Sequence, residues 1–88
     1  MVLKGNTRTR FLVQADYEIN TLSRVLELFT IRGLVFDSLS SRKHPGGLQW
    51  IELDCSGVSD HHTHVLLNKL RQIITVRAVQ VETLVMAA

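Results

Sequence analysis

Two apolar periodicities alternate along this chain, and their order constrains the fold more than any other feature. Residues 10–15 (RFLVQA) alternate strictly, which predicts a strand with one buried face. A stripe with the helical spacing i, i+3, i+4 and i+7 follows within residues 21–32: Leu22, Val25, Leu26 and Phe29. The pattern therefore predicts a strand followed by a helix that buries one side.

The predicted first helix has signals at both ends. Asn20 or Thr21 is placed to cap its start by accepting a hydrogen bond from a free backbone N–H. Arg32 complements the negative end of the helix dipole, and Gly33 supplies the left-handed residue that ends the helix. A second strand is expected directly afterwards, over residues 34–41.

The second half of the chain repeats the pattern after a hairpin. The loop at residues 42–47 (RKHPGG) leads into an alternating strand at 48–55, and a helix begins at Ser59 or Asp60. The apolar stripe of this helix consists of Leu66, Leu67, Leu70, Ile73 and Ile74. A last strand is predicted at 75–83 (TVRAVQVET).

This order of elements predicts an α+β, ferredoxin-like βαββαβ fold, in which four antiparallel strands in the order 4-1-3-2 carry two helices on one face. We expect a single domain over residues 1–88, with 1–8 as a flexible tail and 9–84 as the core. A chain of 88 residues buries only about 60–65% of its unfolded surface, which favours pairing with another chain.

Composition and charge disfavour several classes of function. The chain is 45% hydrophobic and 20% charged, as expected for a globular domain. Its net charge is only +2, and its basic residues are too scattered for a nucleic-acid interface. The closest candidates are a tail group, Lys4, Arg8 and Arg10, and a loop pair, Arg42 and Lys43, which are expected to be solvated charges. No signal peptide and no apolar run of about 18–20 residues is visible, so we expect a cytoplasmic protein without membrane contact.

The histidines are the most conspicuous group with metal-ligand chemistry. His61, His62 and His64 follow Asp60, but only His61 and His64 share a helix face. His44 is the only further histidine. We therefore expect a solvated first helical turn and no metal site.

No set of residues predicts catalysis. Cys55 is the only cysteine and falls on the buried face of its strand, where a thiol acts as a small hydrophobe. Glu52 and Asp54 share the other face, about 6.5–7 Å apart, and are expected to be surface carboxylates rather than an acid–base pair. The residues therefore predict a binding or regulatory module rather than an enzyme.

Short motifs in a shared spacing resemble the ACT domain of acetohydroxyacid synthase small subunits. The motifs of the first half are Leu22, Arg24 and Val25, then Arg32-Gly33, then Ser38-Leu39. Those of the second half are IEL at 51–53, LNKL at 67–70 and ITV at 74–76. The resemblance covers residues 9–82 and is closest to the short type of small subunit.

The resemblance implies a non-catalytic subunit of branched-chain amino-acid biosynthesis. Such a subunit binds and activates the large catalytic subunit, which condenses pyruvate with pyruvate or 2-oxobutanoate. No cofactor is then expected on this chain. Thiamine diphosphate and Mg²⁺, with FAD as an optional third, belong to the catalytic partner.

The resemblance also implies where an amino-acid effector would bind. Many family members hold valine where two ACT domains meet, using the turn before the first helix and the segment after Arg-Gly. The effector-binding positions carried over are Tyr17, Asn20, Gly33, Leu34 and Val35. The family's asparagine, glycine and second asparagine fall on Tyr17, Asn20 and Val35, so the resemblance favours a form that valine does not inhibit.

The second strand is expected to form a dimer contact. In the predicted sheet order it lies at an edge, where unpaired N–H and C=O groups invite pairing with a second copy. The predicted edge residues are Val35, Phe36, Asp37, Ser38 and Leu39. We expect a side-by-side homodimer with an eight-stranded sheet.

Two alternatives remain open. One is a stand-alone ACT-type domain that senses an amino acid. The other is an RNA-binding module, since RNA-recognition domains share this strand order and stack bases on sheet aromatics. Only Phe11 and Trp50 are candidates for stacking; we expect Phe11 in the core and Trp50 against a partner subunit.

Overall fold

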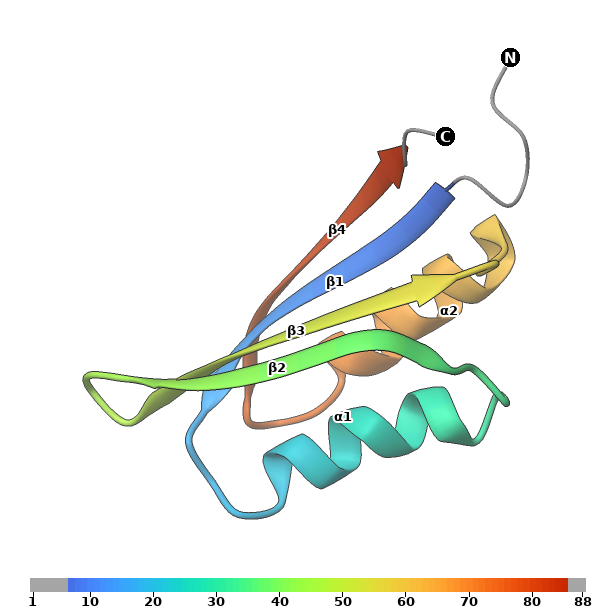
Figure 1. Ribbon diagram of the computed structural model, residues 1–88. Coiled ribbons are helices and arrows are strands. Elements are labelled where there is room, and N and C mark those ends of the chain that lie inside the picture. Colours follow the sequence, from blue (N-terminus) through green and yellow to red (C-terminus); the bar gives the residue numbers. More distant parts are fainter. Residues whose placement is uncertain (1–6, 86–88) are drawn as a thin grey trace.

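Figure 1 shows the computed structural model, which describes residues 7–85. Its elements follow the predicted order: β1 (Thr7–Asp16), α1 (Thr21–Thr30), β2 (Phe36–His44), β3 (Leu48–Ser56), α2 (Asp60–Arg71) and β4 (Val76–Val85). The strands form one antiparallel sheet in the order β2-β3-β1-β4, and both helices pack on the same face. The predicted ferredoxin-like βαββαβ fold is confirmed.

Helix α1 ends at Thr30, two residues earlier than predicted. The predicted stop signals are confirmed: Gly33 has a positive φ of 70°, and Arg32 Nη1 donates a hydrogen bond to the Leu28 carbonyl at 2.9 Å. The predicted cap at the other end is wrong for Asn20, whose backbone is helical. Its side chain makes no capping hydrogen bond within residues 7–85.

Strand β2 begins and ends later than the predicted 34–41, so Leu34 and Val35 precede it. The hairpin turn is correspondingly shorter than predicted. Gly46 and Gly47 both have positive φ, which closes the turn within three residues. At the start of the chain, residues 1–6 of the predicted tail lie outside the described residues, while Thr7 and Arg8 already belong to β1.

The core lies between the sheet and the helices. It consists of Phe11, Val13, Ala15, Val25, Phe29, Ile51, Leu53, Cys55, Leu66, Leu70 and Val79, all buried. Phe29 from α1 packs edge-on against Phe11 of β1, with ring centroids 5.1 Å apart, and Phe36 of β2 closes the group at 5.4 Å. The alternating faces predicted for β1 and β3 are therefore confirmed, including the buried thiol of Cys55.

Helix α2 starts as predicted and ends early. The Ser59 hydroxyl accepts a hydrogen bond from the His62 backbone N–H at 3.1 Å, which caps the helix. The helix ends at Arg71, so Ile74 is not part of its apolar stripe and is 95% exposed. Neither helix in residues 7–85 has the length and apolar character needed to cross a membrane.

Candidate effector-binding site

The loop between β1 and α1 is tied to the sheet at three points. The Tyr17 backbone N–H donates to the Gly47 carbonyl of the hairpin at 2.7 Å, and the Asp16 N–H donates to the Thr75 carbonyl at 2.8 Å. The Gln49 side-chain amide donates to the Asp16 carbonyl at 2.8 Å. These bonds hold the loop in one place although most of its side chains are exposed.

A cavity of about 400 Å³ lies under this loop, next to edge strand β2. Its lining consists of Tyr17, Glu18, Ile19, Leu22, Ser41 and Gln49. Gln49 is 2% exposed, and its amide oxygen accepts a long hydrogen bond of 3.4 Å from the Ser41 hydroxyl. The cavity thus combines a fixed amide, a hydroxyl, a carboxylate and an apolar wall.

A second cavity of about 310 Å³ lies beside the first turn of α1. Its lining consists of Glu18, Asn20, Thr21, Arg24, Ile73, Ile74 and Thr75. Asn20 does not cap the helix with its side chain, so the start of α1 keeps the partial positive charge of an uncapped helix end, and Arg24 lines the same cavity. A carboxylate group suits this end of the cavity, and the Glu18 carboxylate that lines both cavities suits an ammonium group.

Lys43 extends the charge around the loop. Its ammonium group lies over the Tyr17 ring, 5.0 Å from the ring centroid, in a cation–π contact between the hairpin and the loop. The β1–α1 loop is therefore flanked by one basic residue on each side, Lys43 from β2 and Arg24 from α1.

The five predicted effector residues do not meet within one chain. Tyr17 and Asn20 lie in the β1–α1 loop, whereas Gly33, Leu34 and Val35 lie beyond the other end of α1, about 15 Å along the helix axis (Figure 1). Residues 33–35 could lie next to Tyr17 and Asn20 only if they came from a second copy of the chain.

Sequence reasoning missed the polar residues of these cavities. Gln49 falls on the buried face of an alternating strand. A polar residue in such a core position needs hydrogen-bond partners, and this could have indicated a polar site. Glu18 and Arg24 carried no such signal, because a loop carboxylate and a helix guanidinium are ordinary surface residues.

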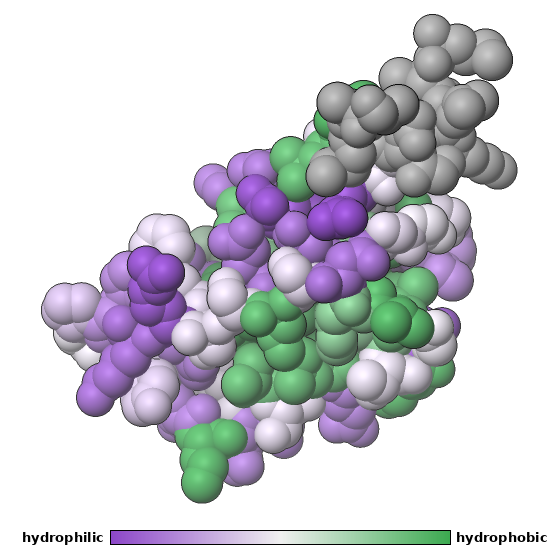
Figure 2. Space-filling view, in the orientation of Figure 1, coloured by the Kyte–Doolittle hydropathy of each residue, from purple (hydrophilic) through white to green (hydrophobic). Residues whose placement is uncertain are grey.

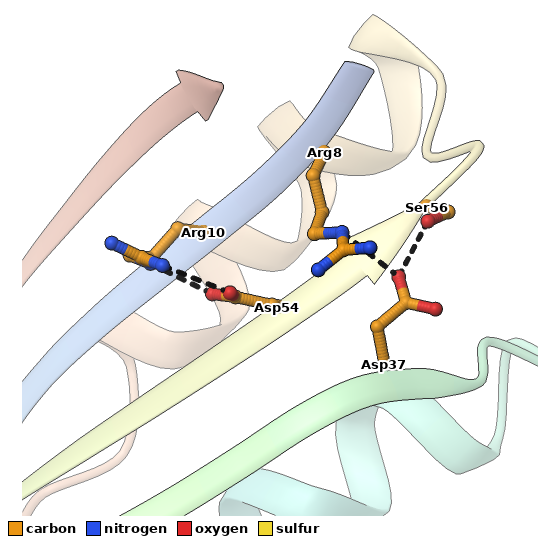
Figure 3. Close-up of polar contacts among 5 residues, drawn as sticks. All are labelled: Arg8, Arg10, Asp37, Asp54 and Ser56. Atoms are coloured by element: carbon orange, nitrogen blue, oxygen red, sulfur yellow. Dashed lines mark hydrogen bonds and ion pairs between the residues drawn. The ribbon is translucent and has the colours of Figure 1, made fainter. Parts of the chain in front are cut away.

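Carboxylates on the sheet face that the helices do not cover are held in ion pairs (Figure 3). Arg10 donates two hydrogen bonds to Asp54, Nε to Oδ1 at 2.8 Å and Nη2 to Oδ2 at 3.0 Å, and its Nε lies 2.9 Å from Glu52 Oε1. The hydrogen bond from Arg10 holds the pKa of Asp54 below its ordinary value. Asp54 is therefore ionised, with both oxygens hydrogen-bonded to Arg10, and it is buried rather than at the surface as predicted.

Asp37 forms a second polar group on the same side of the molecule. Figure 3 shows its carboxylate between Ser56, which donates a hydrogen bond to Oδ2, and Arg8. Arg8 Nε lies 3.7 Å from Asp37 Oδ2, within ion-pair range but too far for a hydrogen bond. These contacts join the start of β1 to a bulge in β2, where the pairing with β3 shifts between Phe36 and Ser38.

The remaining candidate residues stay apart from both cavities. The His61 and His62 rings are 6.0 Å apart at the start of α2, and across residues 7–85 no three His, Cys, Asp or Glu side chains gather as a metal would require. Burial raises the pKa of the Cys55 thiol to about 11, with the Asp37 and Asp54 carboxylates adding to the effect. The thiol is thus protonated at neutral pH and a poor nucleophile.

Comparison with solved structures finds the same fold in several proteins. The C-terminal domain of the MgtC protein from Mycobacterium tuberculosis has a TM-score of 0.75 at 11% identity, covering 100% of this chain and 98% of that one. The ACT domain from GTP pyrophosphokinase of Chlorobium tepidum has a TM-score of 0.73 at 11% identity, covering 85% and 96%. The regulatory subunit of aspartate kinase from Thermus thermophilus has a TM-score of 0.69 at 10% identity, covering 89% and 51%.

These identities are too low to transfer more than the fold, and no curated protein gives a significant match. None of the three structures named is an acetohydroxyacid synthase subunit. A family model described as an ACT-like domain matches residues 3–88, nearly the whole chain. ACT domains are usually regulatory, amino-acid-binding domains rather than catalytic ones. The chain therefore belongs to the ACT-like domain family.

Proposed function

We propose that this chain is a non-catalytic regulatory domain that binds an amino-acid effector at the β1–α1 loop. The observation that carries the proposal is the pair of cavities around Glu18, with Arg24 and the uncapped start of α1 at one end. An α-amino acid presents a carboxylate, an ammonium group and a side chain, and the cavities offer a complementary group for each.

The second copy in this proposal pairs along edge strand β2. Figure 2 shows an apolar surface between β2 and α1, and the exposed apolar residues here include Ile31, Val35 (79% exposed) and Leu39 (42% exposed). Asp37 lies near the start of β2 and Lys43 near its end, so antiparallel pairing with a second β2 sets opposite charges against each other. Such a dimer would carry Val35 of one copy toward the loop of the other.

The catalytic partner in this proposal is the large subunit of a cytoplasmic acetohydroxyacid synthase, which carries thiamine diphosphate, Mg²⁺ and, optionally, FAD. The support is the resemblance of the spaced motifs around Arg24, Gly33 and Leu39. Tyr17, Asn20 and Val35 stand where valine-binding members have amide or glycine residues, so the synthase activity should not respond to valine.

Thermal unfolding with a panel of amino acids tests effector binding. An effector at ten times its Kd should add about 1.4 kcal/mol to the free energy of unfolding, or roughly 6–11 °C in Tm. Arg24→Gln should remove most of this shift, whereas the matched control Arg71→Gln, at the end of α2, should retain it. No shift with any amino acid would contradict the effector site.

Reconstitution tests the partner. The purified chain, mixed with the synthase catalytic subunit from the same organism, should raise the rate of acetolactate formation, and valine should leave that rate unchanged. A Tm shift without complex formation would point to the stand-alone sensing domain instead. Absence of both effects would contradict the proposed function.

A further inference from the structure

The sheet face without helices has an exposed tryptophan near the hairpin end of β3. Trp50 is 44% exposed, and the His44 ring lies against it at an interplanar angle of 38°, with ring centroids 4.9 Å apart. The strand register puts Arg42, Trp50, Gln14 and Ala78 in one row across the four strands. We call the surface around this row the open face.

Trp50 stands between two hollows of the open face. One, of about 300 Å³, lies toward β2 and is lined by Leu12, Ser40, Arg42 and Glu52 among others. The other, of about 180 Å³, lies toward β4 between Leu12, Gln14, Ala78 and Gln80. An exposed ring with hollows beside it permits pairing of like surfaces, because a two-fold axis can place the ring of each copy over a hollow of the other.

Charge is distributed unevenly along the open face. The row of Trp50 contains one charged residue, Arg42. Two rows further along, Arg10 lies between Asp54 and Glu82, and the row in between contains Glu52. This half of the open face therefore has more carboxylates than basic groups and is net negative. If the two-fold axis runs across the strands, the half with Arg42 in one copy faces the acidic half of the other copy. If the axis runs along the strands, the two acidic halves face each other.

Covering the open face leaves few unpaired charges. Asp54 is already bound in both oxygens by Arg10, and Asp16 accepts two hydrogen bonds from Arg77, at 2.8 and 3.3 Å. Buried ionic groups are costly mainly when a partner is missing. These pairs can therefore be covered with a smaller desolvation penalty than isolated charges.

The size of the face suits a weak dimer. Four strands about 4.8 Å apart, each about 30 Å long, present roughly 600 Å² per copy, or roughly 1,200 Å² in a pair. That total is at the lower limit for specific interfaces.

We propose that the open face binds the open face of a second copy, about a two-fold axis across the strands, with Trp50 seated beside the partner's Glu52. This contact is separate from the β2 edge and from the effector cavities. Its failure would leave the proposed function intact, and failure of the proposed function would leave this contact intact.

Trp50 is the only tryptophan of the chain and so reports on this contact directly. Its fluorescence emission should move to shorter wavelength as protein concentration rises through the dimer Kd. Ala78→Glu should weaken this association at least tenfold, whereas Ser23→Glu, on the exposed side of α1, should not. Emission independent of concentration, with a chain that stays monomeric or dimerises only through β2 by sedimentation, would overturn the proposal.

A charge exchange tests the orientation. Arg42→Glu and Glu52→Arg should each weaken association about tenfold alone, because both contacts between Arg42 of one copy and Glu52 of the other would then pair like charges. An equimolar mixture of the two variants should associate as well as the wild type, because both contacts regain opposite charges. Failure of the mixture to associate, or an emission shift produced only by adding a single-stranded oligonucleotide to the monomer, would overturn the proposal.

Discussion

Two buried titratable side chains show how their surroundings decide whether a group is protonated. Asp54 and Cys55 are neighbours on β3 and face opposite sides of the sheet. Asp54 keeps its charge under Arg10, whereas Cys55 is enclosed by apolar side chains and keeps its proton. Their opposite pKa directions yield two predictions.

Asp54→Asn should lower the free energy of unfolding by about 1–3 kcal/mol at neutral pH, because Arg10 loses its bidentate partner. The folded-state pKa of Asp54 lies below its unfolded value of about 3.9, so its contribution is present above that pH and is lost as pH falls through the folded pKa. Urea unfolding between pH 7 and 2 should show that acidification lowers the free energy of unfolding less in the variant than in the wild type. An equal decrease of the free energy of unfolding in both proteins would contradict a stabilising ion pair between Asp54 and Arg10.

Cys55 in the folded protein should not react with a thiol reagent at pH 8, since the thiol is buried and its pKa is raised to about 11. Full reaction should appear when urea unfolds the chain. The measurement is absorbance after adding an aromatic disulfide reagent, and rapid labelling of the folded protein would show that the thiol is accessible.

At the element scale, the exit from α1 and the β2 edge depend on single positions. Gly33 has a φ of 70° and open space around its Cα, so a side chain there would meet backbone strain but no steric contact. Leu39 is the exposed apolar residue on β2 itself, facing the second copy in the proposed dimer.

Gly33→Ala should destabilise the protein by about 1–2 kcal/mol, because a left-handed backbone is costly for alanine. Gly33→Asn should cost less, since asparagine visits this region more readily. Chemical unfolding compares the two variants, and equal losses would show that strain at Gly33 is not the cause.

Leu39→Glu should abolish the β2-edge dimer in sedimentation experiments, because two carboxylates would enter the apolar surface between β2 and α1. Asn68→Glu on the exposed side of α2 is the matched control and should leave it intact. The concentration-dependent shift of Trp50 emission should survive in both variants. A dimer retained by Leu39→Glu in an Ala78→Glu background, in which the open-face contact is also removed, would place the edge contact elsewhere.

At the scale of the whole molecule, stability should depend on association. A chain of this size buries a modest core, and binding of a second copy to the folded state adds to the free energy of unfolding by mass action. The Tm should therefore rise with protein concentration. The double variant Leu39→Glu with Ala78→Glu should have a Tm independent of concentration, and an unchanged rise would show that neither surface is used.

The amino-acid sequence alone predicts the fold, because the period-two and period-3.6 patterns and the glycine at residue 33 are local properties of the chain. It also predicts the buried positions of Phe11 and Cys55. The exact ends of α1, β2 and α2 were less predictable, because pairing with β3 and packing on the sheet extend or end an element beyond its local signals.

Which residues share a surface depends on how the strands and helices are assembled. The cavities around Glu18 join the β1–α1 loop to residues from β2, β3 and the segment before β4. The open face joins Arg42, Trp50, Gln14 and Ala78 from four strands. Strand register sets these neighbours, and register is a property of the assembled sheet rather than of any single segment.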